Sequence, residues 1–180
     1  MLRDTILYNA FAEVNLDRIV HNYKEIRKYV TNDISIMGIV KANGYGHGAV
    51  EVAKVLVDSG VTMLGVATVM EGVELRRAGI KVPILVLGGV QNNHTETIVK
   101  YDLSQTVCNN EIIYNLSKHG YKYNKKPKIH IKIDTGMGRI GLKNSKELNY
   151  FLWELKKYKN IDIEGIYTHF SSSDESDKSI

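Results

Sequence analysis

The sequence lacks the features of a disulfide-bonded, membrane-spanning or disordered protein. Its 180 residues contain one cysteine, Cys108, which excludes an intrachain disulfide and a cysteine-based zinc cluster and favours a reducing compartment. No run approaches the roughly 18 apolar residues of a transmembrane helix, and the first twelve residues lack the apolar core of a signal peptide. With two prolines, 43% apolar and 24% charged residues, the composition excludes collagen-like and disordered classes. We therefore expect a folded cytoplasmic protein that binds no membrane and no metal.

A strong excess of charge of one sign is also missing. The 24 basic and 20 acidic side chains give a net charge of +4, and the lysines are spread along the chain. The densest basic stretch, residues 122–128, is typical of an exposed loop that leads into a strand. Because the sequence shows no known nucleic-acid-binding module, we expect no nucleic-acid partner. The length indicates one domain or a piece of a larger protein.

What the sequence does contain is a regular alternation of short apolar runs with helical patterns. Apolar periodicity and glycine stops predict helices over residues 49–59, 70–78, 96–101, 110–119 and 145–158, the fourth stopped by Gly120 and the last capped by Asn144 with Glu147. The predicted strands are residues 34–40, 63–67, 84–87, 103–108, 128–134 and 161–169.

This alternation favours parallel strand–helix–strand units. Successive strands begin roughly 20 to 30 residues apart, which suits a (β/α)8 TIM-type barrel, for which about 250 residues are typical. About six of the eight units are present, and the polar residues 171–180 add no further helix. A barrel of six strands would leave two unpaired edges, which an open doubly wound sheet tolerates better. The spacing of the strands alone therefore does not decide between the two architectures.

The segment before this series is unusual. Residues 10–16 have the pattern of a short strand outside the alternation, followed by an amphipathic helix over residues 17–30. A strand needs a partner, and the rest of the sequence supplies none that is obvious.

A glycine-rich stretch near residue 140 matches a dinucleotide-binding pattern. Gly136, Gly138 and Gly141 satisfy G-x-G-x-x-G after a predicted strand, with Asp162 further on. The helix capped by Asn144 begins after the third glycine, whereas the fingerprint needs that glycine inside the helix. The preceding strand also alternates polar with apolar residues. We therefore favour an ordinary loop here.

A second glycine-rich stretch follows the first strand of the alternation. Lys41 lies at its carboxyl end, followed by Ala-Asn-Gly-Tyr45-Gly-His-Gly48. A desolvated lysine at this end of a barrel can form a Schiff base, and the glycines let backbone approach a ligand. A lysine that only extends to solvent from a turn is the alternative, and residue chemistry alone favours it.

The string Val40-Lys41-Ala-Asn-Gly-Tyr45-Gly-His-Gly resembles the pyridoxal phosphate attachment motif of bacterial alanine racemases. The resemblance continues in family order over almost the whole chain. It is carried by Asn15-Leu-Asp-Arg18 with His21-Asn22, by Gly65-Val-Ala-Thr with Glu71-Gly and Leu75-Arg76, by Lys132-Ile-Asp-Thr-Gly-Met-Gly-Arg139-Ile-Gly141, and by Gly165-Ile-Tyr-Thr-His169-Phe.

The resemblance implies a role for six residues. Lys41 would bind pyridoxal phosphate as a Schiff base and act as one of two catalytic bases, Tyr45 would contact the cofactor phosphate, and Leu87 would form an apolar wall. Arg139 would bind the cofactor phenolate oxygen and the substrate carboxylate. His169 would lie against the pyridine ring and orient an arginine from elsewhere, and Lys132 matches a position that is often carbamylated. Without the family match, ordinary packing and solvation would explain His169 and Lys132.

The resemblance also implies the fold and activity of a longer protein. Family members are roughly twice this length and form homodimers, and their C-terminal β domain supplies a tyrosine as the second base. We expect residues 1–16 to belong to that β domain and residues 17–180 to form part of the cofactor-binding barrel, inactive without the second base. The implied reaction interconverts L- and D-alanine and supplies D-alanine for peptidoglycan. A racemase for serine or for a broad substrate range, or a single-domain barrel that only binds pyridoxal phosphate, is the alternative.

Overall fold

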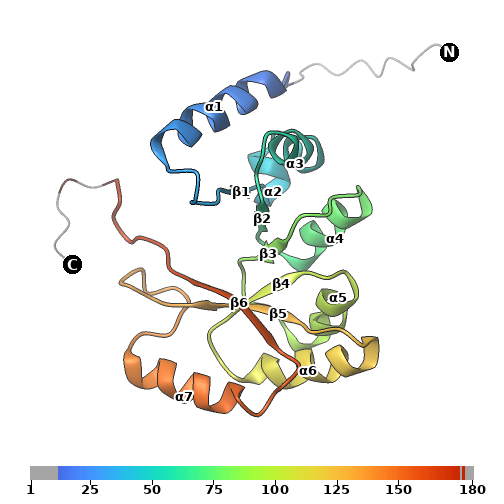
Figure 1. The fold of residues 1–180 in the computed structure, drawn as a ribbon, viewed down its shortest axis with the longest axis vertical. Helices are drawn as coiled ribbons and strands as arrows, with labels where there is room; N and C mark the ends of the chain where they lie inside the picture. The colour runs from blue at the N-terminus through green and yellow to red at the C-terminus, as the bar shows by residue number, and fades with distance from the viewer. Residues whose placement is uncertain (1–11, 175, 177–180) are drawn as a thin grey trace.

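The computed structural model describes residues 12–174 and 176, which form a curved parallel sheet with helices along its outer side (Figure 1). The six strands pair in chain order, β1-β2-β3-β4-β5-β6. A doubly wound sheet would reverse its strand order at a switch point, whereas a barrel adds each strand beside the last. The predicted six units of a (β/α)8 barrel are thereby confirmed. The strands are β1 (Met37–Ile39), β2 (Met63–Val66), β3 (Ile84–Val86), β4 (Ser104–Val107), β5 (Lys128–Lys132) and β6 (Asp162–Tyr167).

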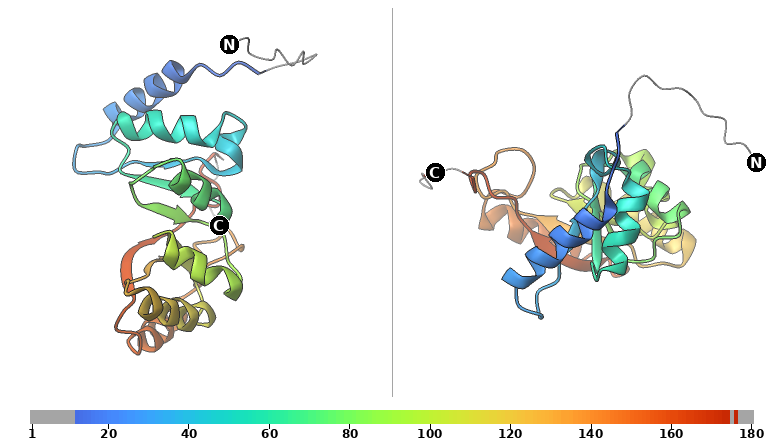
Figure 2. Two further views of the ribbon diagram at one scale, coloured as in Figure 1. Left: turned by 90° about the vertical axis from the view of Figure 1, so that its right-hand side faces the viewer. Right: turned by 90° about the horizontal axis from the view of Figure 1, so that it is seen from above.

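The core lies between the sheet and the helices that connect its strands. Leu64, Ile84 and Ile129 on the strands and Ile98 and Ile113 on the helices are fully buried in one apolar cluster. A further helix, α1, packs against α3 (Figure 2). The helices are α1 (Leu16–Tyr29), α2 (Lys41–Tyr45), α3 (Ala49–Asp58), α4 (Val69–Arg77), η1 (Asn92–His94), α5 (Thr95–Lys100), α6 (Glu111–Tyr123) and α7 (Ser145–Leu155). No helix in the described ranges is long and apolar enough to cross a membrane.

Helix α6 corrects one prediction, because it continues past Gly120 to Tyr123. Its end comes at Asn124, which adopts the left-handed conformation with φ 49°. A Cβ on Gly120 would lie 2.7 Å from Pro127 and from Asn160. This glycine therefore serves the close approach of neighbouring segments and does not stop the helix.

The strand predicted over residues 10–16 is not seen in residues 12–16, the part of it that the structure describes. Residues 10 and 11 lie outside the described residues, and residues 12–15 form neither strand nor helix. Leu16 already belongs to α1, because the Asn15 side chain accepts a hydrogen bond from the Arg18 amide and caps that helix. The assignment of residues 1–16 to a second domain stays a prediction.

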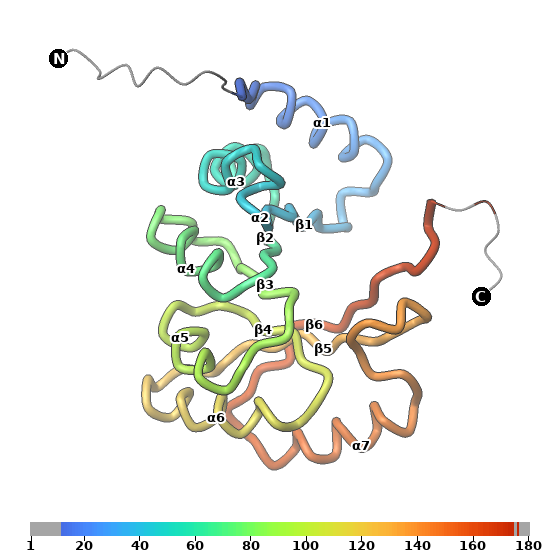
Figure 3. Tube along the Cα trace, turned by 180° about the vertical axis from the view of Figure 1, so that it is seen from behind, coloured from blue at the N-terminus to red at the C-terminus, as the bar shows by residue number. Residues whose placement is uncertain are grey.

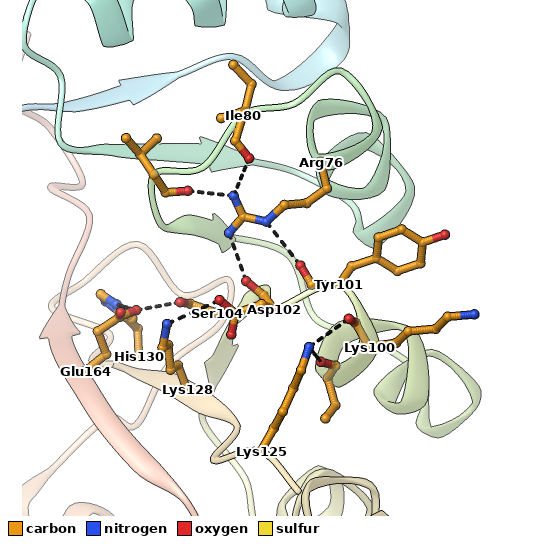
Figure 4. Close-up of polar contacts among 12 residues, drawn as sticks. Arg76, Ile80, Lys100, Tyr101, Asp102, Ser104, Lys125, Lys128, His130 and Glu164 are labelled. Atoms are coloured by element: carbon orange, nitrogen blue, oxygen red, sulfur yellow. Dashed lines mark hydrogen bonds and ion pairs between the residues drawn. The ribbon is translucent and has the colours of Figure 1, made fainter. Parts of the chain in front are cut away.

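The amino ends of the strands are held by a charged side chain from α4. The Arg76 guanidinium donates to the carbonyls of Ile80 and Val82 before β3 and of Tyr101 and Asp102 before β4 (Figure 4). Burial lowers the pKa of Arg76 from its usual value. This network stabilises the end of the barrel opposite to the carboxyl ends of the strands.

Candidate active site

A cleft of about 270 Å³ lies at the carboxyl ends of the strands. Barrel enzymes place their chemistry at this end, because the loops that follow the strands meet there. The cleft brings together all six residues that the sequence singles out, although they come from four different strand–helix units: Lys41, Tyr45, Leu87, Lys132, Arg139 and His169.

The apolar wall of the cleft depends on a glycine in β2. A Cβ on Gly65 would lie 2.6 Å from Ile39 Cδ1, 3.2 Å from Met37 Sδ and 3.3 Å from Leu87 Cδ1. All three of these side chains line the cleft. Because Gly65 has no side chain, these three side chains can occupy the space beside it.

Lys41 begins a turn of left-handed backbone. Ala42, Asn43, Gly44 and Tyr45 have φ values of 51°, 54°, 61° and 55°. For residues other than glycine this conformation costs about 1–2 kcal/mol each, and such strain gathers at functional sites. The turn carries Lys41 at its start and Tyr45 at its end, with the Lys41 Nζ 5.8 Å from the centre of the Tyr45 ring.

Two side chains, one from the turn itself and one from outside, hold this turn in place. The Asn43 carboxamide oxygen accepts a hydrogen bond from the Ala49 amide (3.0 Å) and so connects the turn to the start of α3. From the next strand–helix unit, the Glu71 carboxylate accepts a hydrogen bond from the Ala42 amide (2.8 Å). The strained turn is thus hydrogen-bonded both to the start of α3 and to Glu71.

Lys132 ends β5 on the floor of the cleft and is 3% exposed. Its Nζ donates to the Ile133 carbonyl (2.8 Å) and lies 5.5 Å from the centre of the Tyr167 ring. The Tyr167 hydroxyl shares a hydrogen bond of 2.8 Å with Thr106, and burial raises the pKa of that phenol. A lysine is rarely buried with so few partners.

Arg139 lies on the loop between β5 and α7, which Asp134 organises. The Asp134 carboxylate accepts hydrogen bonds from the amides of Gly136 (3.1 Å) and Gly138 (3.0 Å). These bonds lower the pKa of Asp134, and the bond from Gly138 has the largest effect. The loop closes at Leu142, whose carbonyl accepts from the Asp134 amide. A third glycine inside a closed loop confirms that this stretch is not the start of a dinucleotide-binding helix.

The Arg139 loop is also bonded to the end of β6. Thr135 and Thr168 share a hydrogen bond between their hydroxyls (2.7 Å), and Thr168 donates to the Ile133 carbonyl (2.9 Å). Figure 3 shows the loop after β5 beside the segment that follows β6. This contact sets His169, the next residue, against the same cleft as Arg139.

The electrostatic character of the cleft is one-sided. Lys41, Lys132 and Arg139 line it, and no carboxylate is among its described lining residues. An anionic ligand suits such a site, because neighbouring cations would offset its charge. Fold and cleft together define an α/β-barrel domain with a cationic ligand site at the carboxyl ends of its strands.

Comparison with known proteins gives the family. Residues 14–180 match the alanine racemase N-terminal domain. The alanine racemase of Clostridium tetani is 46% identical over 169 residues. An alanine racemase structure from Clostridium difficile 630 in complex with cycloserine superposes with a TM-score of 0.88 at 40% identity and covers 92% of the chain. The chain belongs to the alanine racemase family, in the part formed by the N-terminal domain.

The matches cover only part of the relatives. The match with the C. tetani protein covers 94% of this chain but only 43% of that protein. The chain likewise spans 45% of the C. difficile structure. A histidine racemase from Leuconostoc mesenteroides shares the fold with a TM-score of 0.79 and 28% identity, over 86% of this chain and 41% of its own. The same fold therefore occurs in proteins named for different amino acids.

Several residues at the site have no role predicted from the sequence, among them Tyr167, Thr168 and Glu71. Tyr167 and Thr168 line the cleft beside His169. They stand in the same string as His169, which is the only sequence signal for them. For Glu71 a partial signal exists, since Thr68 three positions earlier makes a capping box with it. The cap is predictable, whereas the bond to Ala42 depends on the packing of two units.

Proposed function

We propose that this chain binds pyridoxal 5'-phosphate through Lys41 and forms part of an alanine racemase. The observation that carries the proposal is the convergence of Lys41, Lys132 and Arg139 on one cleft that has no carboxylate in its described lining. Membership of the family supplies the reaction class. The activity, substrate and partners of the whole protein are included in the proposal.

The residues of the cleft fit this cofactor. Pyridoxal phosphate has a flat ring, an aldehyde, a phenolate and a phosphate. The amine of Lys41 is suited to the aldehyde, and the guanidinium of Arg139 is suited to an oxyanion. Ile39 and Leu87 supply an apolar wall for the ring. Tyr45 offers a hydroxyl for the phosphate from the same turn as Lys41.

The chain's own residues then have distinct roles. Lys41 Nζ holds the cofactor and exchanges the substrate α-proton on one face. Arg139 binds the substrate carboxylate and the phenolate oxygen, and His169 lies against the ring. When bound, pyridoxal phosphate supplies the electron sink that stabilises negative charge at the α-carbon.

The buried Lys132 is proposed to carry a carbamate. Its amine has one carbonyl and one ring as partners, so addition of carbon dioxide with loss of the amine protons would replace a poorly paired buried cation. A carbamate would turn Lys132 into an anion that could pair with Arg139 and orient it. The second base is proposed to be a tyrosine from outside these 180 residues, in a cytoplasmic homodimer whose D-alanine serves peptidoglycan synthesis.

The choice of substrate is proposed from the relatives, most of which are named for alanine. The histidine racemase neighbour supports keeping other amino acids, serine included, as alternatives. A single-domain barrel that only binds the cofactor is less well supported, since the matched relatives are named as racemases.

The test measures racemisation of L-alanine, L-serine and L-histidine by the protein that carries this sequence. We expect alanine to be converted fastest. Lys41→Ala should lose activity by at least about 10²-fold, the lower range for a general base. Lys54→Ala is the matched control, because Lys54 pairs with Glu51 on the outside of α3. Equal loss in both variants, or no racemisation of any substrate, would overturn the proposal.

A further inference from the structure

The Glu71 carboxylate connects two strand–helix units at the carboxyl end of the sheet. Its Oε1 accepts a hydrogen bond from the Ala42 amide (2.8 Å), 29 residues earlier in the chain. Its Oε2 accepts from the amides of Ala67 (2.7 Å) and Thr68 (3.0 Å), which precede α4. One side chain therefore holds three backbone amides that come from the turns after β1 and β2.

The bond to Ala42 reaches the left-handed turn at its first strained residue. Ala42 follows Lys41 directly, and Ala42, Asn43 and Tyr45 are three of the five non-glycine residues with positive φ in the described ranges. A right-handed backbone would be favoured at these positions. An external contact is therefore needed to keep the turn, and Glu71 provides one.

We propose that Glu71 is a positioning residue that fixes the turn bearing Lys41 and Tyr45. This inference rests on the proposed function of Lys41. The two carboxylate oxygens have different roles, since Oε2 completes the cap of α4 and Oε1 holds the turn. Loss of Oε1 as an acceptor frees the Ala42 amide, and the turn relaxes toward right-handed backbone. Lys41 and Tyr45 then no longer face the cleft together.

Glu71→Gln separates these two roles. The single carboxamide oxygen satisfies two amides if it stays with Ala67 and Thr68, and the NH₂ group then faces the Ala42 amide as a second donor. The cap of α4 is kept and the link to the turn is broken. Thr68→Ala is the matched control, because it removes the hydroxyl that caps the Glu71 amide (3.3 Å) and leaves the carboxylate in place.

The first measurement is amide hydrogen exchange of the protein without cofactor. We expect exchange over residues 41–46 to be about tenfold faster in Glu71→Gln, which corresponds to one lost hydrogen bond to a charged group. Thr68→Ala should accelerate exchange only in the first turn of α4. Unchanged exchange over residues 41–46 in Glu71→Gln, or equal acceleration there in both variants, would overturn the proposal.

The second measurement is an absorbance titration with pyridoxal phosphate. The apparent dissociation constant should rise about tenfold in Glu71→Gln and stay within about twofold in Thr68→Ala, although both lower the unfolding temperature. If the unchanged protein binds no pyridoxal phosphate, the proposed function fails while the exchange experiment still decides the role of Glu71. If the unchanged protein binds the cofactor and Glu71→Gln binds it equally well, the positioning role is wrong.

Discussion

Lys132 and Tyr167 are register partners on β5 and β6, and the Lys132 Nζ lies 5.5 Å from the centre of the Tyr167 ring. The pairing buries the Lys132 amine at the floor of the cleft, where a ring face and one carbonyl are its neighbours. Because the Tyr167 hydroxyl is bonded to Thr106, the ring is fixed in place. The Tyr167 ring therefore forms a rigid surface at the floor of the cleft. The chemical state of the Lys132 amine determines the charge there.

The first prediction follows from that charge. If Lys132 carries a carbamate, Lys132→Ala should lower activity, and added acetate should restore part of it by supplying the missing anion. Bicarbonate labelled with ¹³C should give a carbamate signal that is absent in the variant. Lys128→Ala, at the half-buried start of the same strand, is the control: it should keep the carbamate signal and gain no activity from acetate. Full activity in Lys132→Ala would contradict the carbamate.

The second prediction concerns the space that Gly65 leaves. Gly65→Ala would place a Cβ 2.6 Å from Ile39 Cδ1, and overpacking of this kind costs about 1–3 kcal/mol. We expect weaker cofactor binding together with lower stability, because Ile39 and Leu87 move into the cleft. Gly89→Ala is the control, since nothing lies within 4 Å of its Cβ. Urea unfolding and cofactor titration measure both effects, and equal behaviour of the two variants would refute the packing argument.

The third prediction is a pH dependence at Asp134. Hydrogen bonds from the amides of Gly138 and Gly136 lower the pKa of this carboxyl below its ordinary 3.8. A lowered pKa stabilises the fold above the unfolded value and loses that effect as pH falls through the folded value. Wild type should therefore be more stable than Asp134→Asn near neutrality, and the difference should vanish as the pH falls well below 3.8. A difference in unfolding free energy that is independent of pH would contradict this.

The fourth prediction concerns the end of the barrel away from the cleft. Arg76→Met leaves four backbone carbonyls without their donor, which should lower the free energy of unfolding by about 2–4 kcal/mol. Turnover per folded molecule should not change. Arg77→Met is the control, because Arg77 is exposed and bonds only the Tyr101 hydroxyl among the described contacts. A small loss of stability in Arg76→Met, equal to that of Arg77→Met, would show that the network is dispensable.

The order of strands and helices could be predicted from the sequence, because the alternation of apolar runs and helical periods is a local property. The choice between barrel and doubly wound sheet could not, since strand order depends on packing between distant units. Gly120 shows the same limit within one helix. A glycine stops a helix or permits a close contact, and only the neighbours Pro127 and Asn160 decide which.

The candidate site follows the same division. Lys41, Tyr45, Arg139 and His169 could be identified because they lie in recognisable strings, and the structure places them around one cleft. The left-handed turn after Lys41 could not be predicted, since Ala42 and Tyr45 have no preference for positive φ. Its partner Glu71 is 29 residues away from Ala42, a separation that no local pattern encodes.

The most direct test of the central claim is to identify the lysine that binds the cofactor. The protein that carries this sequence is incubated with pyridoxal phosphate, reduced with borohydride, digested and analysed by mass spectrometry. The pyridoxyl group is predicted on the peptide that contains Lys41, and Lys41→Ala should remove it while Lys54→Ala leaves it unchanged. A pyridoxyl group on Lys132 or on another lysine, or no label at saturating cofactor, would contradict the account.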